Sequence, residues 1–414
     1  MRSSRNSVLF IIPFIAVMFT IGLTTSYTAW AVPDVSVVSL RADCGTDPNC
    51  FNNITDLNNW LSGTRKPSAS KRTLVNIGAG TFIGAITLNC DAVVTTGYVS
   101  FKGAGREVTT ISNSNASSMA FTNCDSITVQ DLKTNSTTQH GVLWTGVGSS
   151  NWTNVGIVGL IKAWQSAADS AGTSCVLGAG QGRHNFFSVI MEVNASSQSS
   201  GIYNACGDLW LWGSEISVVA NVFSSSGALT GIVAKGTGNE VHLYGSNVSV
   251  TSTTNAAATT PSGLVTQAGG VIHFHGGEVV VRYSNTAVNV SVVGASADGT
   301  GSLVHTIETS YGLGATGSGM ATRVAATNSG SVQSVFQWPA AGNPPMGGGG
   351  THLKSLNGQD SYVENDCPLA TKCLATPGSG DKYPHLMIFS DACTGTSPET
   401  GPWFDTITNK CRGI

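Results

Sequence analysis

The strongest constraint on the fold of this chain is a repeat of about thirty residues in its middle. Three segments align without gaps, and their central glycines, Gly213, Gly245 and Gly276, are 32 and 31 residues apart. A fixed period indicates stacked structural units in which equivalent residues form columns. The segments read L-W-L-W-G-S-E-I-S-V at 209–218, V-H-L-Y-G-S-N-V-S-V at 241–250 and I-H-F-H-G-G-E-V-V-V at 272–281.

The alternation of residue types within each segment predicts β-strands. A second short strand precedes each segment, reading G-I-Y at 201, G-I-V at 231 and G-L-V at 263. Helical repeats of similar period need a 3.6-residue pattern, which is missing, and the acidic nonapeptides of calcium-binding rolls are also missing. We therefore expect an all-β solenoid whose strands stack in parallel, about 4.8 Å apart, with one coil per repeat.

Stacking gives each column of the repeat one environment. Apolar columns should line the interior, and they are Leu209/Val241/Ile272, Leu211/Leu243/Phe274, Ile216/Val248/Val279 and Val218/Val250/Val281. Columns with polar or charged members should face outward, and they are Trp210/His242/His273, Trp212/Tyr244/His275, Glu215/Asn247/Glu278 and Ser217/Ser249/Val280.

Two of the outward columns predict a carbohydrate-binding patch. Sugar rings stack on aromatic faces, and a rigid sheet holds such a patch without an ordering cost on binding. The expected partner is a polysaccharide or a cell-surface glycan. The alternative is that a loop or the C-terminal tail covers the patch, because exposed aromatic patches are uncommon. The residues of the patch are Trp210, Trp212, His242, Tyr244, His273 and His275.

The same outer surface carries the candidates for other chemistry. Three of its imidazoles lie within reach of one transition metal, but a stacked aromatic ladder is the favoured interpretation, so neither a metal nor a cofactor is expected. Glu215 and Glu278 share a column two coils apart, with backbones about 9.6 Å apart, near the upper limit for an inverting glycosidase pair. They are weak catalytic candidates, the alternative being solvated surface glutamates. Whether the chain is an enzyme stays undecided.

The N-terminus has the pattern of an export signal. Arg2 and Arg5 precede the apolar run Val8–Leu23, and Ala29-Trp30-Ala31 forms an A-x-A cleavage site, so residues 1–31 should be removed. The alternative is an uncleaved anchor, although the run is short for a membrane span and no later segment is suitable. The protein is therefore expected to be secreted, periplasmic or attached to the cell surface.

Charge argues against nucleic acid as a partner. Only 10% of the residues are charged, and removal of the signal leaves 18 basic against 23 acidic residues, a formal charge of −5. Proteins that bind nucleic acids carry clusters of lysine and arginine, which this chain lacks. Nothing in the sequence predicts the oligomeric state.

All ten cysteines lie beyond the signal, and an even number in an exported chain predicts disulfides. Local pairs 44–50, 90–124 and 175–206 are plausible, with two further bonds among the last four cysteines. No C-x-x-C motif supports zinc binding. The cysteines are Cys44, Cys50, Cys90, Cys124, Cys175, Cys206, Cys367, Cys373, Cys393 and Cys411.

A solenoid needs caps at the ends of its open core. Residues 53–61 place four apolar side chains on one helical face, which predicts a capping helix within an N-terminal segment 32–72. Coils should occupy residues 73–338. Residues 339–350, rich in glycine and proline, have the composition of a linker. The tail 351–414, with four cysteines, should form a small appendage stapled by disulfides.

The first coils resemble a known family. The stretches V-N-I-G-A-G-T-F-I-G-A-I-T-L at 75–88, V-S-F-K-G-A-G-R-E-V-T-T-I at 99–111 and S-I-T-V-Q-D-L-K at 126–133 resemble the opening coils of pectin-lyase-fold proteins, and of pectinesterases in particular. The resemblance covers residues 50–135 by motif and 136–338 only by the coil pattern. It implies a right-handed parallel β-helix.

The catalytic motifs of the family are missing from the sequence. The pectinesterase motifs G-x-x-D-F-I-F-G, Q-D-T and R-x-W do not occur, and Gly84 replaces a glutamate that is usual after the first turn. The motifs of polygalacturonases and the acidic calcium site of pectate lyases do not occur either. The favoured function is therefore glycan binding without catalysis, and the alternative is a carbohydrate-active hydrolase, lyase or esterase with a non-standard acidic site.

Overall fold

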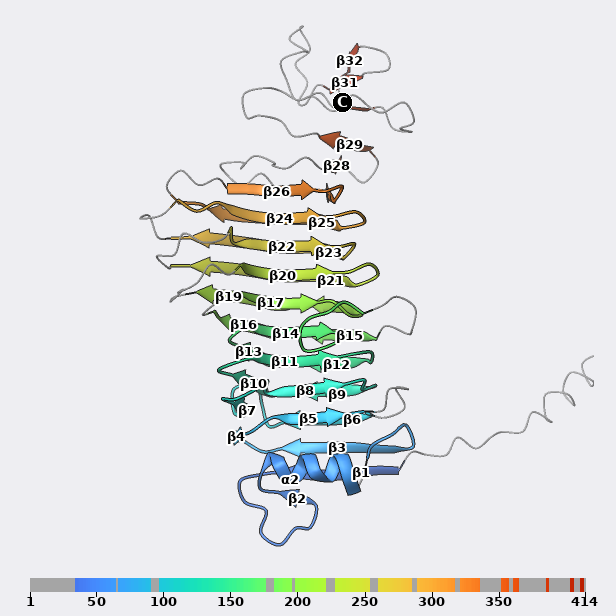
Figure 1. Cartoon of the computed structure of the whole chain (residues 1–414), viewed down its shortest axis with the longest axis vertical. Helices are drawn as coiled ribbons and strands as arrows, with labels where there is room; N and C mark the ends of the chain where they lie inside the picture. Colours follow the sequence, from blue (N-terminus) through green and yellow to red (C-terminus); the bar gives the residue numbers. More distant parts are fainter. Residues whose placement is uncertain are drawn as a thin grey trace, which may run out of the picture.

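The chain folds into an elongated right-handed parallel β-helix (Figure 1). The computed structural model describes residues 34–64, 66–90, 97–175, 182–195, 198–220, 228–253, 260–284, 289–316 and 321–335, and five short strands between 351 and 412. Nearly all strand pairs are parallel, with each strand bonded to its equivalents in the coils before and after it. The expected all-β solenoid is thus confirmed.

Ladder 1 carries the residues of the predicted aromatic patch. Its strands pair in parallel, coil after coil. They are β1 (Asp34–Leu40), β3 (Lys71–Ile77), β6 (Val99–Gly103), β9 (Ile127–Gln130), β12 (Ser150–Thr153), β15 (Arg183–Phe187), β18 (Asp208–Trp212), the first halves of β21 (Glu240–Ser252), β23 (Val271–Tyr283) and β25 (Leu303–Gly314), and then β27 (Ser331–Val335) and β28 (Thr351–Leu356).

Ladder 2 follows ladder 1 in each coil and contains the column of Glu215 and Glu278. Its strands are β4 (Gly80–Ile83), β7 (Thr109–Asn113), β10 (Lys133–Ser136), β13 (Gly156–Gly159), β16 (Ile190–Asn194), β19 (Glu215–Ala220) and the second halves of β21, β23 and β25.

Ladder 3 closes each coil as a separate sheet. Its strands are β5 (Ile86–Asn89), β8 (Met119–Thr122), β11 (His140–Thr145), β14 (Lys162–Ala167), β17 (Ser199–Asn204), β20 (Leu229–Lys235), β22 (Ser262–Gln267), β24 (Val292–Asp298) and β26 (Ala321–Thr327).

A residue with positive φ makes the corner between ladders 1 and 2. Gly213, Gly245 and Gly276 have φ of 54°, 56° and 64°, a region that suits glycine because it has no Cβ. Ser188 and Glu308 take the same conformation in the neighbouring coils, with φ of 53° and 52°. The repeat glycines found in the sequence therefore mark this corner.

The interior is filled by the apolar columns that the repeat predicts. Leu209, Leu211, Val241 and Leu243 are fully buried, as are their equivalents in the next coil. Earlier coils fill the same space with large rings, among which Trp144, Trp152 and Trp164 are fully buried. Because ladder 1 is apolar inward and the coils are hydrogen-bonded along the axis, the outward side chains are held at fixed positions.

Glycines in ladder 3 allow the sheets to approach closely. Gly201, Gly231 and Gly263 lie side by side in adjacent coils. A Cβ on Gly231 would overlap the side chain of Val248 in ladder 2 and lie 2.6 Å from the carbonyl oxygen of Gly263. The glycine of each G-I-Y or G-I/L-V strand thus leaves room for a core valine or isoleucine.

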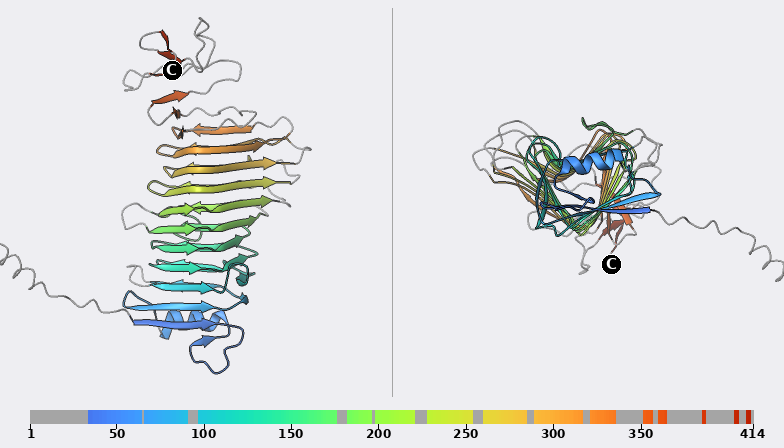
Figure 2. Two further views of the ribbon diagram at one scale, coloured as in Figure 1. Left: turned by 180° about the vertical axis from the view of Figure 1, so that it is seen from behind. Right: turned by 90° about the horizontal axis from the view of Figure 1, so that it is seen from below.

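A short helix closes the N-terminal end of the core (Figure 2, right). Helix α2 (Ile54–Asn59) continues as a π-helical turn at Trp60–Thr64, and Ile54, Leu57 and Leu61 are buried. The Asn53 side chain accepts a hydrogen bond from the backbone N–H of Asp56 and so caps the helix. The short strand β2 (Cys50–Phe51) precedes the helix and pairs with β1.

At the other end, β28 continues ladder 1 by pairing in parallel with β27. The strand β29 (Asp360–Glu364) pairs antiparallel with β28, and β30 (His385–Leu386), β31 (Trp403–Asp405) and β32 (Lys410–Arg412) form a small antiparallel sheet. The expected signal at 1–31 and linker at 339–350 lie outside the described residues, as does the expected pairing of the four tail cysteines. No helix within the described residues is long and apolar enough to cross a membrane.

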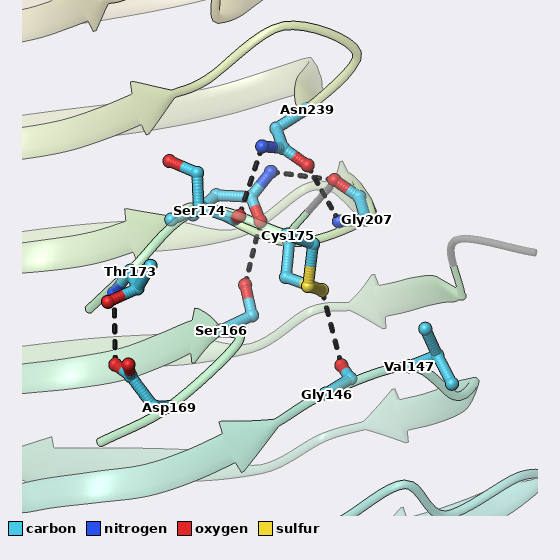
Figure 3. The surroundings of a disulfide bond; sticks show 12 residues. Gly146, Val147, Ser166, Asp169, Thr173, Ser174, Cys175, Gly207 and Asn239 are labelled. Atoms are coloured by element: carbon cyan, nitrogen blue, oxygen red, sulfur yellow. Dashed lines mark hydrogen bonds between the residues drawn. A yellow bond between two sulfur atoms is a disulfide. The ribbon is translucent and has the colours of Figure 1, made fainter. Parts of the chain in front are cut away.

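Three of the expected disulfides are confirmed. Cys44 pairs with Cys50, Cys90 with Cys124 and Cys175 with Cys206. The disulfide between Cys175 and Cys206 lies at the end of the described loop residues 168–175, which follow β14 (Figure 3). Within this loop the Thr173 backbone N–H donates to the Asp169 carboxylate (3.1 Å), and the loop covers Tyr203, whose hydroxyl donates to the Gly172 carbonyl (2.9 Å). The bond therefore fixes the loop against ladder 3.

Candidate functional site

The register of ladder 1 brings the predicted patch residues into two adjacent columns. Trp210 pairs with His242, and His242 with His273, while Trp212, Tyr244 and His275 form the parallel column. All six side chains point outward and are partly exposed. The columns extend further than the repeat indicated, because His305 follows His273 and Phe187 precedes Trp212. We call these eight residues the aromatic face.

The rings of the aromatic face stack on one another along the axis of the β-helix. The Phe187 and Trp212 rings are 4.6 Å apart at 5°, and Trp210 and His242 are 4.1 Å apart at 19°. Tyr244 stacks on His275 at 5.0 Å and 23°. Such offset stacking stabilises neighbouring coils beyond simple burial.

Because of this stacking, the faces of the two tryptophan rings are not free to stack on a sugar. The Trp210 ring lies between His242 on one side and the guanidinium of Arg183 on the other, at 3.9 Å. Trp212 lies between Phe187 and Tyr244. Both indole faces are therefore occupied, and the tryptophans present edges to the outside. Phe187, which is 40% exposed, is the end of its stack.

Charged groups border the face on the same strands. Arg183, Asp208 and Glu240 occupy one column, and the Glu240 carboxylate lies 3.0 Å from Nε2 of His242. Burial, followed by repulsion from Glu240, raises the pKa of Asp208. The border thus offers a cation and two carboxylates for hydrogen bonds beside the ring edges.

The four histidines of the face favour the neutral state. Burial lowers the pKa of His242, His275 and His305 below the usual 6.5, and it lowers the pKa of His273 to about 4, with neighbouring histidines adding to the shift. Neutral imidazoles keep one unprotonated ring nitrogen. Two groups of three side chains have ligand atoms within 4.8 Å of one another, namely His273/His275/His305 and Glu240/His242/His273.

Glu215 and Glu278 lie in one column of ladder 2, as the repeat predicted, with Asn247 between them. Both are exposed, and the Asn247 side-chain oxygen accepts a hydrogen bond from the backbone N–H of Glu278. A general acid needs a raised pKa, which requires burial or a nearby like charge. The surroundings of these glutamates do not supply burial. The residues lie across the glycine corner from the aromatic face.

Five residues of this site were missed from the sequence: Phe187, Arg183, Asp208, Glu240 and His305. The stretch L-V-H-T-I-E at 303–308 aligns with V-I-H-F-H-G at 271–276 and identifies His305, but Glu308 replaces the corner glycine and hides this repeat. Phe187 precedes Ser188, which replaces the corner glycine and hides the repeat. Arg183, Asp208 and Glu240 lie outside the aligned segments.

Comparison with known proteins finds only distant likenesses. No protein-family model matches the sequence, and no curated protein matches it. Among solved structures, the chain is similar to the pectin methylesterase of carrot, with 12% identity, 79% of this chain and 84% of that chain covered, and a TM-score of 0.36. Pectin methylesterase PemA of Erwinia chrysanthemi is 12% identical, with 77% of this chain and 93% of that chain covered and a TM-score of 0.38. ORF18 of Geobacillus virus E2 is 10% identical, with 88% of this chain and 67% of that chain covered and a TM-score of 0.35.

Identities of 10–13% and TM-scores below 0.4 transfer no residue roles. The parallel ladders and the capping helix themselves show the parallel β-helix that the resemblance of the opening coils implied.

Proposed function

We propose that the protein is an exported β-helix that binds a polysaccharide or cell-surface glycan along the aromatic face, without catalysing its breakdown. The observation that carries the proposal is the band of eight outward, partly exposed rings on a rigid ladder, bordered by Arg183, Asp208 and Glu240. Ring edges and the exposed Phe187 ring supply apolar contact, and the border groups supply hydrogen bonds to hydroxyls.

Export is supported by two independent features. The N-terminal sequence has the pattern of a signal peptide, and three disulfides join cysteines in the described coils and cap. Disulfides form and persist outside the cytosol. An exported protein with few titratable groups suits binding to a carbohydrate surface better than acid–base chemistry, which needs desolvated carboxyl groups.

Replacing Phe187 and Trp212 with alanine should weaken glycan binding at least about tenfold, because each ring contributes about 1 kcal/mol or more of contact. The measurement is affinity electrophoresis or calorimetry of the mature protein against pectins, alginate and other polyuronates. Phe187→Ala alone tests the face with the least effect on folding, since this ring is already 40% exposed.

The matched control is Ile83→Ala, which removes an apolar side chain that is 73% exposed on β4, far from the aromatic face along the coils. It should bind like the parent protein. Equal affinity of Phe187→Ala, Trp212→Ala and Ile83→Ala would remove the aromatic face from the proposal. Release of sugar fragments or methanol by the parent protein, lost in Glu215→Gln with Glu278→Gln, would replace it with the enzyme alternative.

A further inference from the structure

Three histidines lie together where the aromatic face ends, towards the C-terminus. We propose that His273, His275 and His305 bind one divalent transition-metal ion, such as Zn²⁺. The proposal is independent of glycan binding. It departs from the expectation drawn from the sequence, in which a purely stacked ladder was favoured and His305 was not recognised.

The distances between the ring nitrogens fit a shared metal. Nδ1 of His273 lies 3.4 Å from Nδ1 of His305, which is long for a hydrogen bond. Two nitrogens bound to tetrahedral zinc at 2.0–2.1 Å are separated by about 3.3–3.4 Å. The third ligand atom, from His275, lies within 4.8 Å of the other two. Rotation of His275 about its side-chain bonds, to bring its nitrogen to about 3.4 Å from the other two, would complete the set.

The ring orientations favour this group of three. The lone pair of an imidazole nitrogen lies in the ring plane, so rings that share a metal must point their edges at one point. The His305 ring stands at 87° to His273 and 83° to His275, which lets the edges converge. The stacked ring pairs of the aromatic face, by contrast, have interplanar angles of only 5–27°. The orientation of the His305 ring thus distinguishes a metal-binding group from a stack of parallel rings.

The second group, Glu240/His242/His273, fits a metal less well. His242 and His273 stack face to face at 4.7 Å and 12°, so their lone pairs run parallel and do not converge. The Nε2 atom of His242 already lies 3.0 Å from the Glu240 carboxylate and is satisfied by that contact. The Glu240–His242 pair is therefore assigned a role in holding the stack.

The backbone holds the three ligands in place. His273 and His275 alternate on β23, so both point outward, and His305 is the register partner of His273 on β25. Strand residues paired on both sides need little ordering when a ligand binds. Three nitrogen ligands suit zinc, copper or nickel, whereas calcium and magnesium prefer oxygen. A fourth position towards the outside stays open for water or a second ligand.

Equilibrium dialysis of the untagged mature protein against Zn²⁺ tests the site, with bound metal quantified by mass spectrometry. One ion per chain should bind to the site, and His305→Asn should weaken it at least about 100-fold. His275→Asn gives a second variant that should lose the ion without loss of the fold, as monitored by circular dichroism.

Two controls define the outcome that would overturn the site. Glu240→Gln and His242→Asn should keep the ion, because neither residue belongs to the assigned ligands. Loss of zinc in these variants, or equal affinity in His305→Asn and the parent, would contradict the assignment. In the parent, zinc at 100 times its dissociation constant should stabilise the fold by about 2.7 kcal/mol, and His305→Asn should lose this gain.

Discussion

Replacing Gly231 with alanine should lower the free energy of unfolding by about 3 kcal/mol, although only one methyl group is added. That methyl group would overlap the side chain of Val248 in ladder 2 and crowd the carbonyl oxygen of Gly263, which lies on the hydrogen-bonded neighbouring strand β22. Backbone cannot move aside as a flexible side chain can. The shift is measured as the change in the midpoint of urea unfolding, followed by circular dichroism.

The matched control is Gly63→Ala, in the π-helical turn of the N-terminal cap. A Cβ at this position meets no atom within 4 Å, and the residue is exposed. Alanine here should leave stability within about 1 kcal/mol of the parent, since its helix propensity is higher than that of glycine. Similar midpoints for the two variants would show that ladder 3 yields to the added methyl group and that the glycine column is not required for packing.

The glycine column illustrates what the sequence predicts and what it leaves out. The repeats G-I-Y, G-I-V and G-L-V showed that a glycine recurs, but not that a core valine of another ladder occupies the space beside it. That contact joins Gly231 to Val248, which belong to different ladders of the coil. Periodicity gives the neighbours of a residue along the coil axis, whereas contacts across the interior depend on the shape of the coil.

The fold itself was predictable where the coils have constant length. From β18 to β23 the repeat predicted the columns, and the strand register agrees with every one of them. Earlier coils differ in length. A hydrogen bond between adjacent coils joins Ser126 to Ser149, 23 residues apart, whereas the one between Ser150 and His184 joins residues 34 apart. Loops of variable length between strands hide the period, so those coils were inferred only from resemblance.

The candidate site was predictable only in part. Alternation placed Trp210 and Trp212 on the outer surface, but it carries no information on side-chain torsions. The side-chain torsions lay the rings flat on one another, so that Arg183 and His242 cover the two faces of the Trp210 indole. For the same reason the near-perpendicular ring of His305, on which the metal site depends, is invisible in a sequence column.

The second large effect that we expect is a loss of folding stability at acidic pH, caused by His184. His184 is completely buried between the rings of Trp144 and Trp164, and burial lowers its pKa to about 3. The unfolded chain has the ordinary histidine pKa of about 6.5, so between pH 6.5 and 3 it binds a proton that the folded chain excludes. Stability contributed by neutral His184 is therefore complete above pH 6.5 and is lost as the pH falls, by up to about 1.4 kcal/mol per pH unit.

His184→Leu should flatten this dependence, since leucine occupies the same column in the next coil as Leu209. Urea unfolding at pH 7, 5.5 and 4.5 gives the slope of stability against pH for each variant. The slope, and not the stability at pH 7, is the informative quantity, because the Ser150 hydroxyl loses the imidazole 2.8 Å away in this variant. Other titrating groups, including buried His140, whose pKa burial lowers to about 4, contribute equally to both proteins.

Ser150→Ala separates the hydrogen bond from the titration. This variant removes the hydroxyl that contacts both His184 and the Nε1 atom of Trp152, so it should lower stability at every pH by about 1–3 kcal/mol. It keeps the buried imidazole and should therefore keep the slope of the parent. Parallel curves for the parent and His184→Leu would mean that the acid sensitivity of the fold arises elsewhere. A flattened curve in His184→Leu alone assigns it to one histidine enclosed by tryptophans.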